Sequence, residues 1–204
     1  MMRFFGKPAP VTLTLVIINA LIFAYGTISG TQESIIIHYG FIPNELFHSS
    51  FILDALLRLF TSMFIHANIA HISFNLFALI YMGGFAERSI GVPRFILLYV
   101  VAGLGGGLLY GGVASYILSS GESILIGASG AISGILGVSA ALGDVRGYYW
   151  LAIQVIYVFI GSVTLIPIAF MAHVGGFLSG LFLTRTMIAV ERRKRNRNSN
   201  AFTA

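Results

Sequence analysis

Residues 124–142 read ILIGASGAISGILGVSAAL, an uncharged stretch in which glycine, alanine and serine are interspersed with large aliphatic side chains. A helix needs about 20 predominantly apolar residues to cross the hydrocarbon core of a bilayer, and this stretch is close to that length. Gly130 and Gly134 lie four residues apart, which allows a second backbone to approach closely. The segment therefore predicts a membrane-spanning helix packed against a neighbour.

The composition of the whole chain supports a membrane protein. Its 204 residues are 57% hydrophobic and only 9% charged, with a mean hydropathy of +0.90, whereas soluble domains carry about 25% charged residues. This low charge density excludes a nucleic-acid-binding domain despite a pI near 9.7. The absence of cysteine excludes disulfides, thiol catalysis and Cys-ligated metals, and we expect neither a metal nor a cofactor.

Six stretches of suitable length lie between charged or proline-marked breaks. The break between the fifth and sixth stretches depends on Pro167 alone. The first stretch lacks the small-residue cleavage site of a signal peptide, so we expect it to be retained. We predict an all-α polytopic protein with one membrane domain over residues 1–190 and a basic cytoplasmic tail over residues 191–204. The six predicted spans are 11–28, 69–85, 95–117, 124–142, 148–168 and 171–190.

The distribution of basic residues predicts the orientation of these spans, because lysine and arginine favour cytoplasmic loops. With the N-terminus inside, only Arg58 falls on the outer side. Both termini are therefore expected in the cytoplasm, and the short tails suit a multi-pass protein of the plasma membrane. The basic residues placed inside are Arg3, Lys7, Arg88, Arg94, Arg146, Arg185, Arg192, Arg193, Lys194, Arg195 and Arg197.

The segment 31–67, between the first two spans, is too long for a turn and too apolar for a solvated loop. Large apolar residues recur at roughly helical spacing from Phe51 to Met63, which is typical of a helix lying in the membrane interface. Asp54 and Arg58 are four residues apart and could pair on one face of that helix.

Polar residues inside spans are rare and usually functional. The second, fourth and sixth spans all run from outside to inside, so residues early in each lie at similar depth. His71, Ser129 and His173 occupy such positions, and Asn75 shares a helical face with His71. Two further polar residues, Ser133 and Gln154, lie in the fourth and fifth spans. The pattern predicts one polar layer below the outer surface.

This layer contains the parts of a serine hydrolase. Ser129 becomes a nucleophile if the neutral imidazole of His173 accepts its proton. The N–H groups of Ala128 and Ser129, with the side chains of His71 and Asn75, could stabilise the oxyanion. Aspartate and glutamate are absent from the outer halves of the predicted spans, so we expect a dyad without a carboxylate to orient the base.

Glycine spacing explains how the two helices carrying the dyad could come within hydrogen-bond distance. Gly130 and Gly134 follow Ser129, and Gly176 and Gly180 follow His173. Each pair forms a G-x-x-x-G face, where backbones pack closely.

Together these motifs resemble the signature of the rhomboid intramembrane serine proteases. The family pattern H-x-x-x-N matches His71 and Asn75, G-x-S-G matches residues 127–130, and A-H-x-x-G-x-x-x-G matches residues 172–180. The resemblance implies a six-helix bundle with an interfacial first loop. It also implies that the partners are the lipid bilayer and single-span membrane proteins, which are cleaved near their outer end.

Carried over by position, the resemblance implies that Ser129 is the nucleophile and His173 the general base and acid. His71 and Asn75 would be oxyanion donors, and Gly127 would lie beside the nucleophile.

The resemblance also has departures and structural counterparts. Arg58 resembles the arginine of the family's first-loop Trp-Arg motif, although Leu57 stands where tryptophan is usual. Ser133 stands where an aromatic ring often packs on the histidine, so either another side chain orients His173 or Ser133 donates a hydrogen bond. Glu87 resembles a structural acidic site.

Alternatives remain for some residues and for the protein class. His66 is either an interfacial loop residue or a support for the loop, and Gln154 is interpreted as a packing or gate-region residue. A transporter or channel is disfavoured because the halves show no inverted repeat. A metalloprotease would need His-Glu-x-x-His, which is absent. A catalytically silent rhomboid relative that binds membrane proteins would be expected to lack Ser129 or His173.

Overall fold

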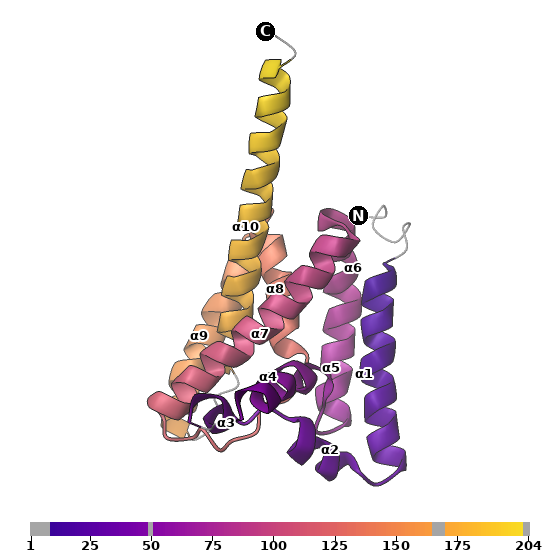
Figure 1. Cartoon of the computed structure of the whole chain (residues 1–204), viewed down its shortest axis with the longest axis vertical. Helices are drawn as coiled ribbons and strands as arrows, with labels where there is room; N and C mark the ends of the chain where they lie inside the picture. Colours follow the sequence, from indigo (N-terminus) through magenta and orange to yellow (C-terminus); the bar gives the residue numbers. More distant parts are fainter. Residues whose placement is uncertain (1–8, 49–50, 165–169, 202–204) are drawn as a thin grey trace.

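The computed structural model describes residues 9–48, 51–164 and 170–201, and these parts of the chain are helical apart from their connections and one isolated β-bridge. The long helices form a bundle, and the short helices of the first loop lie across one end of it (Figure 1). The bundle helices are α1 (Pro10–Ile28), α5 (Ile69–Ala78), α6 (Gly84–Ile90), α7 (Val92–Tyr116), α8 (Ser129–Ala141), α9 (Arg146–Thr164) and α10 (Phe170–Ala201). The loop helices are α2 (Gln32–Tyr39), α3 (Pro43–Phe47) and α4 (Ile52–Thr61), followed by a 3₁₀ turn at Ser62–Phe64.

Four helical segments in the described residues are long and apolar enough to cross a membrane. They are Pro10–Ile28, Ile69–Ile90, Val92–Tyr116 and Phe170–Asn200, the second being α5 and α6 joined by a π-helical turn at Leu79–Gly83. The predicted all-helical membrane fold is therefore confirmed. Six spans remain a prediction, because α8 is shorter and residues 165–168 of the fifth predicted span, with its boundary at Pro167, lie outside the described residues.

Helix α8 occupies the centre of the bundle. Ten of its 13 residues are buried, and it packs against α7 and α10, whose segments cross it in Figure 1. A helix of 13 residues is only about 20 Å long at 1.5 Å per residue. Its first turn lies inside the protein, since Gly130, Ala131 and Ile132 are buried and Ser129 is partly buried.

The prediction of a helix from residue 124 is wrong for its first five residues. Leu125 exchanges both backbone hydrogen bonds with Phe41 of the first loop, at 2.8 and 3.0 Å. Gly127 donates its N–H to the carbonyl of Ser62 at 2.9 Å and has a φ of +117°, a conformation that favours glycine. These contacts hold the chain extended until Ser129, where α8 begins.

The contact between α8 and α10 is made by backbone against backbone. A Cβ placed on Gly176 would lie 2.8 Å from the carbonyl carbon of Gly130, and one on Gly180 would lie 2.6 Å from the Cα of Gly134. A Cβ on Gly130, in contrast, would meet its nearest neighbour, the Ala172 carbonyl oxygen, at an ordinary 3.5 Å. The glycines of α10 therefore set the spacing, and α8 supplies the backbone that they contact.

Arg58 anchors the first loop through partners that its spacing did not predict. Its guanidinium forms an ion pair with Glu45 of α3 at 2.6 Å and also donates to the carbonyls of Gly40 and Ile37. The predicted pair with Asp54 is therefore wrong. A folded-back loop offers Arg58 a carboxylate, whose two oxygens both lie near its Nη1, and two backbone carbonyls. Several acceptors around one partly buried guanidinium outweigh a single exposed i,i+4 pair.

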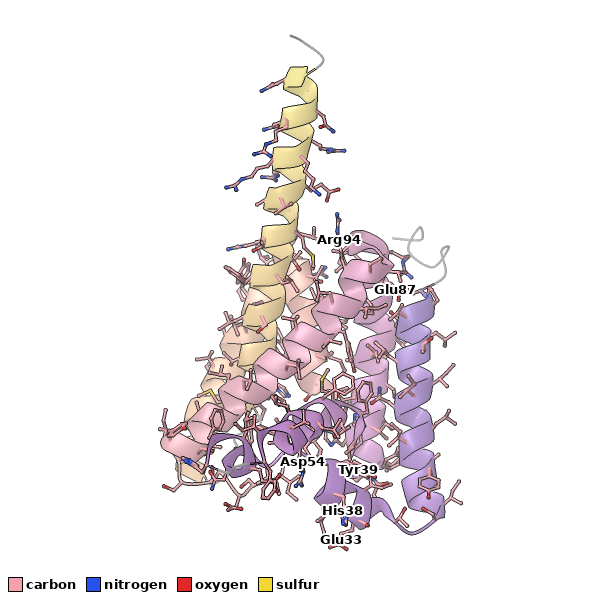
Figure 2. The ribbon with its side chains drawn as sticks, viewed as in Figure 1. Glu33, His38, Tyr39, Asp54, Glu87 and Arg94 are labelled. Carbon is pink, nitrogen blue, oxygen red and sulfur yellow. The ribbon has the colours of Figure 1, made fainter. Side chains whose placement is uncertain are left out.

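The opposite end of the bundle holds the charged contacts of the spans. Glu87 is buried and accepts hydrogen bonds from the backbone N–H groups of Val11 and Thr12 at 3.1 and 2.7 Å, so it caps the first turn of α1. Arg94 pairs with Glu191 at 3.1 Å. Figure 2 shows Glu87 and Arg94 at this end, with Glu33, His38 and Asp54 at the other. Helix α10 continues beyond the predicted end of its span at residue 190 and carries the basic tail (Figure 1).

The asymmetry of the glycine contacts can be tested by stability. Gly176→Ala and Gly180→Ala should each destabilise the protein by about 1–3 kcal/mol, because overpacking forces the backbones apart. Gly130→Ala should be close to neutral, since its added methyl group meets only ordinary contacts. Thermal unfolding of the purified protein in detergent measures this. Equal losses in all three variants would contradict the assignment of the close approach to α10.

Candidate active site

Ser129 is the first residue of α8, with Ala128 as the N-cap. The first N–H groups of a helix have no acceptor within the helix, and the helix dipole makes this end partially positive. The extended residues before Ser129 and the left-handed Gly127 therefore present its hydroxyl beside a group of unused backbone donors. That arrangement suits a nucleophile whose reaction creates a negative oxygen.

His173 lies in the first described turn of α10 and faces Ser129. Its Nε2 is 2.9 Å from the Ser129 Oγ, which is hydrogen-bond distance. The two residues are 44 positions apart in the chain, so the glycine contact between α8 and α10 brings them together. The structure thus contains the serine–histidine pair that the spacing of the spans predicted.

The second ring nitrogen of His173 also has a partner. Its Nδ1 lies 2.8 Å from the Oε1 of Gln154 on α9, and Gln154 is only 7% exposed. Interpreting Gln154 as a packing or gate-region residue missed this contact. The available signal was its four-residue spacing from Trp150, the single tryptophan of the chain, which puts a bulky ring and an amide on one face of α9.

The aromatic ring that Ser133 replaces is supplied from other helices. The ring of Trp150 lies 6.0 Å from that of His173, and the ring of Phe170 lies 5.8 Å away in an edge-on arrangement. The hydroxyl of Ser133 donates instead to the Ser129 carbonyl at 2.6 Å. Both alternatives left by the sequence are therefore seen: other side chains surround His173, and Ser133 donates a hydrogen bond, which goes to the Ser129 carbonyl.

His71 and Asn75 lie on α5 next to the start of α8. A Cβ on Gly127 would lie 2.7 Å from the His71 Nε2 and 3.7 Å from the Ser129 Oγ, so the imidazole reaches the space beside the serine. Asn75 donates through Nδ2 to the His71 carbonyl at 2.8 Å. Asn68 caps the same helix by accepting from the His71 N–H at 2.9 Å. These contacts fix the turn that carries both side chains.

The chemistry of the site is that of neutral groups. Ser129, His173 and Gln154 form a continuous chain of hydrogen-bond distances, and the His71 imidazole lies beside Gly127. In the residues that the structure describes, no group of three or more histidine, cysteine or acidic side chains could hold a metal ion. The arrangement can move a proton from a hydroxyl to an imidazole.

Comparison with known proteins identifies the family. The model of the rhomboid domain matches residues 54–190, which is more than half of the chain and includes Ser129 and His173. The chain belongs to the rhomboid family. The sequence resemblance is thereby confirmed, and the protein is a multi-pass membrane protein of this family.

The relatives of this rhomboid include plant and bacterial proteins. RHOMBOID-like protein 1 of Arabidopsis thaliana is 35% identical over 136 residues, which are 62% of this chain and 33% of the relative. Rhomboid protease GluP of Bacillus subtilis (strain 168) is 35% identical over 134 residues, 65% of this chain and 24% of the relative. The YdcA protein of the same organism is 30% identical over 149 residues, 68% of this chain and 69% of the relative. The matches thus span less than half of the first two relatives.

His66 of this rhomboid is more than an interfacial loop residue. It is fully buried, and its ring packs edge-on against that of His71 at 4.9 Å. Its backbone carbonyl accepts from Gln32 at 2.5 Å, which ties the end of the loop to α2. Burial, and secondarily the nearby His71, lowers the pKa of His66 to about 4. His66 is therefore neutral at pH 7 and supports the turn before α5.

The buried, neutral His66 predicts an acid-sensitive contribution to stability. The folded pKa lies below the unfolded value of about 6.5, so the unfolded chain binds more protons between these values and stability falls as pH decreases from about 6.5 to about 4. His66→Phe keeps a ring and removes the titration, so it should lose less thermal stability than the wild type over this range. His38→Phe, at an exposed position, is the control. Identical pH profiles for wild type and His66→Phe would contradict the buried neutral state.

Proposed function

We propose that this rhomboid is an intramembrane serine endopeptidase that hydrolyses a peptide bond in or near the transmembrane segment of single-span membrane proteins. The observation that carries the proposal is the distance of 2.9 Å between the Ser129 Oγ and the His173 Nε2 at the partly buried start of α8. A packing serine would need no histidine at that position. The similarity to Rhomboid protease GluP supports the same reaction.

The reaction follows from the positions of the atoms. His173 Nε2 accepts the proton of Ser129 as the Oγ attacks the carbonyl carbon of the scissile bond. The protonated imidazole then gives that proton to the departing amine, which leaves an ester on Ser129. A water molecule, activated by the same Nε2, attacks the ester carbonyl and releases the acid product and the free serine.

The tetrahedral intermediates carry a negative oxygen that needs donors already in place. The N–H groups of Ala128 and Ser129 are the proposed backbone donors, at the positive end of α8. The His71 imidazole lies beside the serine, and the Asn75 amide has a second N–H besides the one donated to the His71 carbonyl. The proposed oxyanion hole therefore combines a helix N-terminus with two side chains of α5.

The charge distribution supports an active site that opens to the extracytoplasmic side. Arg94 lies at the end of the bundle from which the basic part of α10 extends (Figure 2), and arginine-rich ends favour the cytoplasm. The start of α8 is bonded to the first loop at the opposite end, through Leu125 and Gly127. We place both termini in the cytoplasm of a plasma-membrane protein with six spans.

Loss of either dyad residue should abolish proteolysis. Ser129→Ala and His173→Ala each remove one half of a single proton-transfer unit, so the double variant should be about as inactive as either single variant. The assay uses the purified protein reconstituted with a model single-span substrate, with cleavage read by mass spectrometry. Retained cleavage by Ser129→Ala would contradict the serine mechanism.

A fluorophosphonate probe separates catalysis from binding. It should label the wild type at Ser129 and leave Ser129→Ala unlabelled, because the probe reacts only with an activated hydroxyl. A rhomboid that binds membrane proteins without cleaving them would bind the substrate and resist the probe. Such a result would contradict the protease proposal and favour a catalytically silent rhomboid relative.

The oxyanion donors should give a partial effect. Removal of one well-placed donor costs roughly 10²- to 10³-fold in turnover, so His71→Ala and Asn75→Ala should fall in that range while the probe still labels Ser129 slowly. Ser133→Ala is the control. The Ser133 hydroxyl donates to the Ser129 carbonyl and is therefore no oxyanion donor, so this variant should lose less turnover than either α5 variant. Unchanged turnover in both α5 variants would leave the backbone N–H groups as the sole donors.

A further inference from the structure

We propose that Gln154 is the positioning residue of the active site: by accepting from His173 Nδ1–H, it selects the tautomer whose Nε2 is free to act as base. This inference rests on the proposed serine mechanism for its consequence, although the hydrogen bond itself can be observed without any activity. It makes α9 the helix that orients the base and replaces the carboxylate of a serine triad with a neutral amide.

The distances occupy both nitrogens of one ring. His173 Nδ1 lies 2.8 Å from Gln154 Oε1, and Nε2 lies 2.9 Å from Ser129 Oγ. Since Gln154 is 7% exposed, a bond to its amide oxygen exchanges little with water. The imidazole is therefore fixed at both ends, between α9 and α8.

The amide oxygen determines where the ring proton lies. A neutral imidazole carries one N–H, and its other nitrogen is an acceptor. Because Oε1 of Gln154 can only accept, its contact with His173 requires the proton on Nδ1. Nε2 then has a free lone pair toward Ser129. The opposite tautomer would face the serine with an N–H and could not accept its proton.

Aromatic packing holds Gln154 in this place. Trp150 and Gln154 lie one turn apart on α9, and His173 and Phe177 lie one turn apart on α10. The rings of Trp150 and Phe177 stack at 6.0 Å with an angle of 25°, and Tyr148 contacts the same Phe177 edge-on at 6.3 Å. Phe177 is fully buried. The stacked pair thus fixes α9 against α10 so that the Gln154 amide lies next to the His173 imidazole.

The buried position beside His173 favours a neutral hydrogen-bond acceptor over a charged one. An aspartate in a serine triad orients the histidine and also stabilises the imidazolium, but a carboxylate in a buried membrane site costs several kcal/mol of desolvation unless it is paired. The amide provides the orientation without that charge. Gln154 is therefore expected to act on the geometry and tautomer of His173, with a smaller effect on rate than the loss of a triad aspartate, which is about 10⁴-fold.

The first test reads the tautomer directly. Histidine labelled with ¹⁵N is incorporated, and long-range proton–nitrogen spectra of the protein in detergent are recorded at pH 8, with the His173 signals assigned by their absence in His173→Ala. The wild type should show a protonated Nδ1 and a bare Nε2, and Gln154→Met should show loss of that preference. A protonated Nε2 in the wild type, or an unchanged tautomer in Gln154→Met, would overturn the proposal.

The second test measures the consequence for Ser129. Gln154→Met should lower kcat and the rate of fluorophosphonate labelling by about 10- to 100-fold, with KM changed by less than about twofold, because substrate contacts are retained. Gln154→Glu, which as a protonated acid stays neutral and keeps a carbonyl oxygen as acceptor, should recover part of the labelling rate. Ile156→Met, at a 55% exposed position of α9, is the matched control and should resemble the wild type.

The outcomes distinguish the two proposals. If the wild type is labelled and cleaves substrate while Gln154→Met equals it in rate, the positioning role is wrong and the serine mechanism stands. If Ser129→Ala behaves like the wild type, the serine mechanism is wrong, and the tautomer spectrum still decides whether Gln154 holds His173. A drop in Ile156→Met as large as in Gln154→Met would assign the effect to the packing of α9 and overturn the positioning role.

Discussion

The candidate active site depends on one contact, the backbone of α8 lying directly against the backbone of α10. Gly176 and Gly180 leave no side chain between their helix and the main chain at Gly130 and Gly134. Membrane helices gain little from apolar burial against each other, so close van der Waals packing of small residues has to hold them together. This spacing brings the Ser129 hydroxyl within 2.9 Å of an imidazole from another helix. A wider helix pair would hold the same two residues without a hydrogen bond.

The first loop is part of the same scaffold. The bridge between Phe41 and Leu125 and the bond from Gly127 to Ser62 keep the chain extended until Ser129, which gives α8 an N-terminus inside the protein. Arg58 in turn ties the loop together through Glu45 and two carbonyls. Since these donors and acceptors are satisfied within the loop, Leu57 can be 58% exposed without weakening them. Arg58 therefore holds the first loop together without a neighbouring tryptophan.

Sequence spacing predicted those features that repeat along one helix or align between spans of known direction. The shared depth of His71, Ser129 and His173 and the glycine faces followed from such rules. The start of α8, the partner of Arg58 and the contact of Gln154 did not, because each depends on a residue from a different element. Helical periodicity carries no information about which helix lies opposite, so α9 supplied an orienting amide that its own pattern could not assign.

Charged side chains stabilise the end of the bundle, whereas the groups around Ser129 are neutral. Glu87 is buried, but it is bonded to backbone N–H groups at the start of α1, and Arg94 and Glu191 pair at the bundle end. Around Ser129 the contacting groups are a hydroxyl, imidazoles and an amide. A low-dielectric site penalises a permanent charge but strengthens the field of fixed dipoles. A site built from neutral groups therefore avoids that penalty at rest. In the proposed reaction, its dipoles have their full effect when the imidazolium and the oxyanion form together.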